Sequence, residues 1–98
     1  MKTYALAGLA LVLVSGSAFA GTPYVDNREH RQAHRIYDGI QSGQLTYGEA
    51  AQLIRGQARV RRLERYFKSD GVVTPGERAV LHHKLNQQSR RIYYKKHN

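Results

Sequence analysis

The chain has 98 residues with 16 basic and 7 acidic side chains, and it contains no cysteine. This length allows one domain, and a domain this small buries only about 60% of the surface that its unfolded chain exposes. The lack of cysteine excludes disulfides, a thiol nucleophile, covalent haem attachment and a cysteine-based zinc site. The formal net charge of +9 indicates either an acidic partner or a strongly charged, solvated surface.

Residues 1–20 have the three parts of a secretory signal peptide. Lys2 supplies a positive charge, residues 5–14 form an apolar run (ALAGLALVLV), and small residues flank the expected cut in the triplet AFA. A membrane-spanning helix needs about 20 apolar residues, so this run is too short to be one. We expect cleavage after Ala20 and a location in the periplasm, with full secretion as the alternative.

Cleavage there removes 20 of the 98 residues, Lys2 among them and no acidic residue, so the remaining 78 residues carry one positive charge fewer, +8. Residues 21–27 (GTPYVDN) contain glycine, proline and asparagine, which resist regular structure, and we predict a disordered lead-in there. Residues 28–98 are predicted to form a single small helical domain.

Three helices are predicted in this domain, at about residues 28–42, 47–68 and 75–96. Apolar residues recur there at helical spacing, and no segment alternates as a strand does. The fold class is therefore all-α, with the helices joined by two glycine-containing turns. The residues predicted to face the core are Ala33, Ile36, Tyr37 and Ile40 in the first helix, Ala50, Leu53, Ile54, Val60, Leu63 and Phe67 in the second, and Leu81, Leu85 and Ile92 in the third.

The second and third helices begin with the same signal, a threonine followed three residues later by a glutamate. Thr46 with Glu49, and Thr74 with Glu77, form capping boxes in which each side chain bonds a free backbone N–H of the other residue. Pro75 strengthens the second box because proline is favoured at the first helical position. For the first helix, Asp26 or Asn27 is the expected cap.

The two turns also match each other at an offset of 28 residues. Residues 42–49 and 70–77 share glycine, an aliphatic residue, threonine and glutamate in the same order. The glycines are expected to adopt a positive φ, and the aliphatic residue to close the turn against the core. We interpret the domain as a pseudo-repeated helix–turn–helix.

The second turn resembles the latter half of an EF-hand calcium loop. Asp70 and Gly71 match the central aspartate and glycine, and Glu77 matches the final bidentate glutamate. The two preceding ligand positions hold Tyr66 and Lys68, and a lysine repels a cation. Calcium binding at these degenerate turns is kept as an alternative to a purely structural capped turn.

The whole predicted domain resembles a family of small exported proteobacterial helical proteins. The motifs that carry the resemblance are R-I-x-x-G-x-x-S-G-x-L-T-x-x-E, D-G-x-V-T-x-x-E-R and S-x-x-I-Y-x-x-K-H-N, at residues 35–49, 70–78 and 89–98. The resemblance implies a periplasmic helical protein without a settled activity. It therefore implies a fold and a location but no chemistry.

Histidines supply a second candidate for metal binding. His30 and His34 lie four residues apart on one predicted helix, which is a usable two-ligand spacing for zinc or copper. His82 on the third predicted helix is the candidate third ligand, and Glu29 is a further candidate. The alternative is that these histidines are polar residues at the edges of the apolar faces. Asp70 and Glu77 of the second turn are the remaining candidate metal ligands beside these histidines.

Basic residues form the strongest pattern in the chain. In the second predicted helix, arginines recur on one face, and in the third, basic residues lie opposite the apolar stripe. Arginine outnumbers lysine, which favours bidentate contacts with phosphate or carboxylate groups. The alternative is a solvated face that keeps a small protein soluble. The predicted anion-binding residues are Arg55, Arg59, Arg62, Lys84, Arg91 and Lys95.

No catalytic motif is present, and two of the seven carboxylates are expected in helix caps, so we predict that the protein is not an enzyme. The predicted function is that of a non-catalytic periplasmic interaction protein. Its partner would be an anionic envelope component, including a membrane surface contacted peripherally, or an acidic protein. Nucleic acid is expected as a partner only outside the cell. The alternative function is metal binding or metal stress, with zinc, copper or calcium; otherwise no cofactor is expected.

Overall fold

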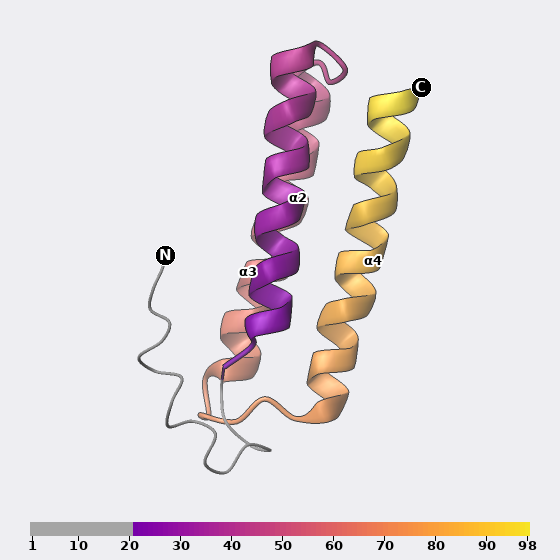
Figure 1. The fold of residues 1–98 in the computed structure, drawn as a ribbon. Coiled ribbons are helices and arrows are strands. Elements are labelled where there is room, and N and C mark those ends of the chain that lie inside the picture. Colours follow the sequence, from indigo (N-terminus) through magenta and orange to yellow (C-terminus); the bar gives the residue numbers. More distant parts are fainter. Residues whose placement is uncertain (1–20) are drawn as a thin grey trace.

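Three helices pack side by side in the computed structural model, which describes residues 21–98. They are α2 (Pro23–Ser42), α3 (Tyr47–Lys68) and α4 (Pro75–His97), and they run up, down and up (Figure 1). Each helix contacts the other two. The predicted all-α fold is confirmed, since the described residues contain no strand. The predicted signal peptide lies outside the described residues.

Both predicted capping boxes are present. In α3, Thr46 Oγ1 accepts from the Glu49 N–H at 3.0 Å, and Glu49 accepts in return from the Thr46 N–H at 2.9 Å. In α4, Thr74 and Glu77 make the same two bonds at 3.1 and 2.9 Å. These bonds satisfy backbone donors that the first turn of a helix leaves free, and they explain why both helices begin where the sequence predicts.

The two turns close as predicted. Gly43 and Gly71 have φ values of 80° and 88°, in the region where a side chain is strained. Leu45 and Val73, which follow them, are both buried. Each turn thus combines a glycine reversal, a buried aliphatic residue and a capped helix start.

The cap of α4 supports a direct prediction. Thr74→Ala removes the oxygen that accepts from the Glu77 N–H and should cost about 1 kcal/mol of unfolding free energy. In a domain this small, that lowers the melting temperature by roughly 4–8 °C. Thr74→Ser keeps the oxygen and should melt close to the wild type. An unchanged melt for Thr74→Ala would show that this cap does not stabilise the fold.

The predicted disordered lead-in at residues 21–27 is wrong, because α2 begins at Pro23 and not near residue 28. Proline suits the first helical position, and Val25 is buried against the other two helices. Thr22 occupies the N-cap position of α2, where its side chain makes no capping bond. The predicted cap at Asp26 or Asn27 is therefore wrong as well. Tertiary packing of Val25 thus extends the helix into a segment whose composition predicts disorder.

The core consists of two apolar clusters, one towards each end of the bundle, and each draws on all three helices. One cluster contains Ile36, Leu45, Ala50, Leu53 and Ile92. The other contains Val25, Val60, Leu81 and Leu85, with Leu63 and Phe67 packed against it.

A layer of buried glutamines lies between these clusters, with one glutamine from each helix. Gln32, Gln57 and Gln88 are each at most 3% exposed. Gln32 donates to the Leu85 carbonyl at 2.9 Å, and Gln88 donates to the Leu53 carbonyl at 2.7 Å. Both polar atoms of the Gln57 side chain lack a partner among residues 21–98. These three glutamines occupy core positions, and a search for apolar residues alone does not identify them.

Three residues predicted to face the core lie at its margin instead. Ile54 and Tyr37 are 50% and 58% exposed, and Ala33 is also exposed. The stripe of α3 that faces its neighbours runs through Leu53 and Gln57, which leaves Ile54 beside α2. There the three residues line a shallow groove between α2 and α3.

Candidate functional site

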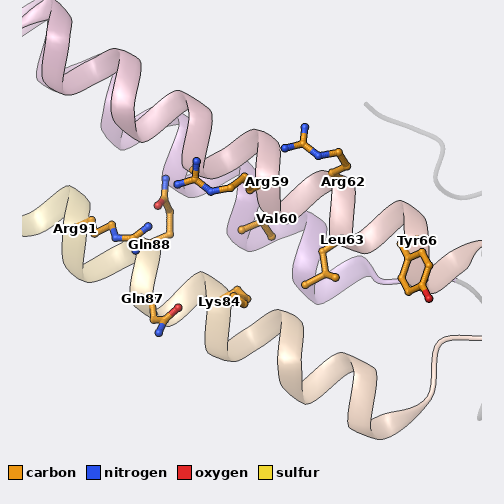
Figure 2. Close-up of a pocket in the computed structure, with 10 residues that line it drawn as sticks. Arg59, Val60, Arg62, Leu63, Tyr66, Lys84, Gln87, Gln88 and Arg91 are labelled. Carbon is orange, nitrogen blue, oxygen red and sulfur yellow. The ribbon is translucent and has the colours of Figure 1, made fainter.

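A groove of about 520 Å³ runs between α3 and α4 (Figure 2). Its edges carry basic side chains from both helices, and its floor is apolar, with Val60 and Leu63. The helices approach closely at Gly56, where a Cβ atom would lie 2.4 Å from the Gln88 side-chain oxygen. The polar and aromatic residues that line the groove are Arg59, Arg62, Tyr66, Lys84, Gln87, Gln88 and Arg91.

A second groove of about 380 Å³ continues the first along the same pair of helices. It shares Arg59 and Arg91 with the first groove, and it adds Arg55, Lys95 and Gln52. The six predicted anion-binding residues therefore all line one continuous track between α3 and α4, which we call the basic groove. The sequence places these residues on a face of each helix, and the structure places the two faces opposite each other.

The basic groove has uncompensated charge. None of the residues that line its two parts is a carboxylate. Within residues 21–98, no hydrogen bond or salt bridge engages the six basic side chains. Lys95 does interact electrostatically with one carboxylate outside the groove. The pKa of Glu49 is lowered mainly by the Thr46 backbone hydrogen bond and, to a smaller extent, by Lys95. The guanidinium and ammonium groups therefore remain available to an external anion.

The arginines between α2 and α4 differ in this respect. Arg28 donates to Asn86 at 2.8 Å and contacts His82 Nδ1 at 3.1 Å. Arg35 donates to Ser89 Oγ at 2.8 Å. These guanidinium groups hold helices together, whereas those of the basic groove have no such role.

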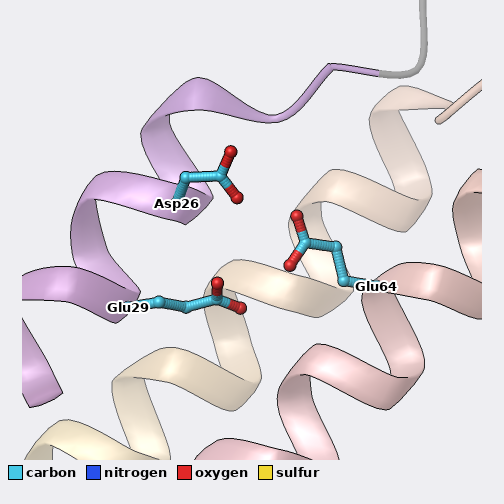
Figure 3. A group of neighbouring side chains, drawn as sticks. All are labelled: Asp26, Glu29 and Glu64. Atoms are coloured by element: carbon cyan, nitrogen blue, oxygen red, sulfur yellow. The ribbon is translucent and has the colours of Figure 1, made fainter. Parts of the chain in front are cut away.

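A cluster of three carboxylates lies on another side of the bundle, between α2 and α3 (Figure 3). Asp26 and Glu29 project from α2 three residues apart, and Glu64 projects from α3. One oxygen from each lies within 4.8 Å of the others. The Thr22 hydroxyl and the Lys68 ammonium, the latter at 2.9 Å, both donate to Glu64. We call these three acidic residues the carboxylate cluster.

Two members of the carboxylate cluster have pKa values shifted in opposite directions. Burial raises the pKa of Glu29 to about 8. Side-chain hydrogen bonding with Glu64 and the negative charges of Glu64 and Asp26 add to this rise, while Arg61 opposes it. Burial also disfavours ionisation of Glu64, but hydrogen bonds from Thr22 and Lys68 outweigh it and lower the pKa of Glu64 to about 2. At neutral pH, Glu64 is thus ionised and Glu29 keeps its proton when no other cation is present.

The predicted metal ligands do not come together. His34 pairs with Asp38 at 3.8 Å. His82 contacts Arg28, and the pKa of His82 is lowered by burial and, to a smaller extent, by the charge of Arg28. Asp70 accepts from the Val72 N–H at 3.1 Å, while Glu77 caps α4 and His30 is exposed. Across residues 21–98, the carboxylate cluster is the only group of three possible ligands that are this close together.

Comparison of the chain with models of known protein families, with characterised proteins and with solved structures gave no match. Among the described residues, no helix is long and apolar enough to cross a membrane.

Proposed function

We propose that the protein is an exported, non-catalytic binding protein that uses the basic groove to contact an anionic component of the cell envelope. The observation that carries this proposal is the gathering of six unpaired basic side chains, from two helices, along one groove. Grouped charges raise the local concentration of an anion far more than the same charges spread over the surface.

The shape of the basic groove favours a ligand with several negative charges. From Arg55 to Tyr66, α3 advances about 16 Å at 1.5 Å per residue. Four of the six basic residues are arginines, whose planar guanidinium groups bind phosphate or carboxylate oxygens in pairs. The apolar floor at Val60 and Leu63 adds contact with the non-polar part of an amphiphile. A phosphorylated lipid or lipopolysaccharide has this combination, and an acidic protein surface shares the charge.

The predicted signal peptide directs the proposal to the envelope. A periplasmic protein with a net charge of +8 meets anionic phospholipid headgroups and lipopolysaccharide phosphates before it meets nucleic acid. The proposal therefore joins two independent features, an export signal in the sequence and a basic groove in the fold.

Neutralising three groove arginines tests the proposal. The variant Arg59→Gln/Arg62→Gln/Arg91→Gln should bind vesicles of phosphatidylglycerol or lipopolysaccharide at least about tenfold more weakly, because each basic residue near an anionic surface contributes about 1 kcal/mol at low salt. Vesicle co-sedimentation at 20, 100 and 300 mM salt measures this. Wild-type binding should weaken as salt rises, since salt screens exposed charges.

The matched control, Arg31→Gln/Arg65→Gln/Arg90→Gln, removes the same charge from exposed residues outside the basic groove. It should retain most of the wild-type affinity. Equal losses in both triple variants would mean that only net charge matters, and the groove would lose its assigned role. Wild-type binding that is absent, or that does not change with salt, would contradict the proposal altogether.

A further inference from the structure

The carboxylate cluster contains a buried oxygen atom that has no hydrogen-bond partner in the described part of the chain. Glu29 is 9% exposed, and its Oε2 atom is buried with no hydrogen-bond partner among residues 21–98. An unsatisfied buried carboxylate oxygen is costly, and such atoms in native proteins commonly face an ion or a water molecule. Figure 3 shows Glu29 and the other two carboxylates directed into a common space.

The distances within the carboxylate cluster fit a shared ion. Oxygens that bind one calcium ion lie 2.3–2.6 Å from it, so two of them can be no more than about 5 Å apart. One oxygen from each of Asp26, Glu29 and Glu64 meets this limit, since the three lie within 4.8 Å of one another. Two helices thus position three ligands before any ion binds.

Few positive charges contact the three acidic groups directly. Within residues 21–98, only Lys68 forms a salt bridge with them, to Glu64, and its charge also acts on Asp26. His30 and Arg61 act on Asp26 and Glu29 electrostatically, without a salt bridge. The chain has only seven acidic residues, and three of them lie in this cluster. The cluster is therefore an acidic site within a strongly basic protein.

We propose that Asp26, Glu29 and Glu64 bind a hard divalent cation of the Ca²⁺, Mg²⁺ and Mn²⁺ class. The ligand atoms are all oxygens, which such ions prefer, and the cluster contains no sulfur or imidazole ligand that would favour zinc or copper. The Thr22 hydroxyl, which donates to Glu64, orients that carboxylate from outside the ligand set. Asp26 is partly exposed and leaves one side open for coordinated water.

Titration of the chelator-treated protein tests the site. We expect at least one of CaCl₂, MgCl₂ and MnCl₂ to bind with a stoichiometry of one by calorimetry. At saturating ion the melting temperature should rise by roughly 5–10 °C, because an ion that binds only the folded state stabilises it. The three salts, measured separately, identify the preferred ion.

Four variants show whether the carboxylate cluster is the site. Asp26→Asn and Glu29→Gln keep the side-chain shapes and should each weaken ion binding about tenfold or more. Asp38→Asn removes an exposed carboxylate elsewhere on α2 and should bind as the wild type does. Lys68→Met removes the competing cation and should tighten ion binding, although loss of its ion pair with Glu64 weakens the fold.

Two results would overturn the site. One is no calorimetric signal and no change in melting temperature with any of the three ions at millimolar concentration. The other is unchanged affinity in both Glu29→Gln and Asp26→Asn. The triple variant of the basic groove should bind the ion normally, so this result is independent of the proposed anion binding.

Discussion

Gly56→Ala is expected to destabilise the protein by about 1–3 kcal/mol, although alanine is the better helix former. Its new Cβ atom would lie 2.4–2.8 Å from three atoms of the Gln88 side chain. Gln88 is buried and donates to the Leu53 carbonyl, so it cannot move aside without losing that bond. Overpacking costs about 1–3 kcal/mol and the lost bond about 1 kcal/mol, against a gain of about 1 kcal/mol in helix propensity.

Two further variants separate steric conflict from helix propensity. Gly48→Ala makes the same change in an exposed turn of α3, where the new Cβ would meet only Thr46 at 3.9 Å. It should stabilise the protein by up to about 1 kcal/mol. Adding Gln88→Ala to Gly56→Ala should recover at least about 1 kcal/mol relative to the sum of the single changes, because contacting residues are not additive. Urea unfolding of the wild type, of Gly48→Ala, Gly56→Ala and Gln88→Ala, and of the double variant measures these differences. Strict additivity would contradict the assigned contact.

Glu29→Gln is expected to stabilise the metal-free protein increasingly as pH rises. In the folded state the pKa of Glu29 is about 8, whereas in the unfolded chain it is near 4.5. Between these values the folded state holds a proton that the unfolded state has lost, so the unfolding free energy falls as pH increases. Glutamine stays neutral and avoids this loss. Its advantage should be small at pH 5 and on the order of 3 kcal/mol at pH 9.

Urea unfolding at pH 5, 7 and 9 in a buffer with EDTA measures this difference, and Asp38→Asn serves as the charge-matched control. The control should track the wild type at each pH. A constant offset between Glu29→Gln and wild type across the range would contradict the raised pKa.

Glu64 affects stability in the opposite sense, at acid pH. Its folded-state pKa is about 2, so its contribution to the unfolding free energy is present above about pH 4.5 and is lost as pH falls towards 2.

Local signals account for the parts of the fold that were predicted well. The capping boxes at Thr46 and Thr74 define two helix starts, and the glycines at 43 and 71 define the turns. Both signals act through bonds or backbone preferences within a few residues, so neighbouring sequence contains all the information that they need. The start of α2 lacks such a signal and was misplaced, because burial of Val25 by distant helices determines it.

The carboxylate cluster was missed for a related reason. Assigning residues 21–27 to a disordered segment removed Asp26 from the helix, and with it the spacing of three residues to Glu29 that places both on one face. Glu64 lies 35 residues beyond Glu29, and nothing near it in the sequence links the two. A continuous helical pattern from Pro23 onward was the signal that would have paired Asp26 with Glu29.

The buried glutamines show the limit of hydrophobic pattern. Gln32, Gln57 and Gln88 have the polarity of surface residues, yet each points into the bundle. Their helical positions lie in the core stripe, but a pattern that counts only apolar residues skips them. Buried polar groups of this kind can specify how helices align, since only one register pairs them.

The sequence by itself determined the fold class, the turns, the starts of the last two helices and the six basic residues now found in the basic groove, because short-range spacing encodes these features. Only the tertiary structure decided that the basic faces of α3 and α4 lie opposite each other, that Asp26 and Glu29 meet Glu64, and where α2 begins. These features depend on the rotation and register of packed helices, which are set by contacts such as Gly56 with Gln88 between residues far apart in the chain.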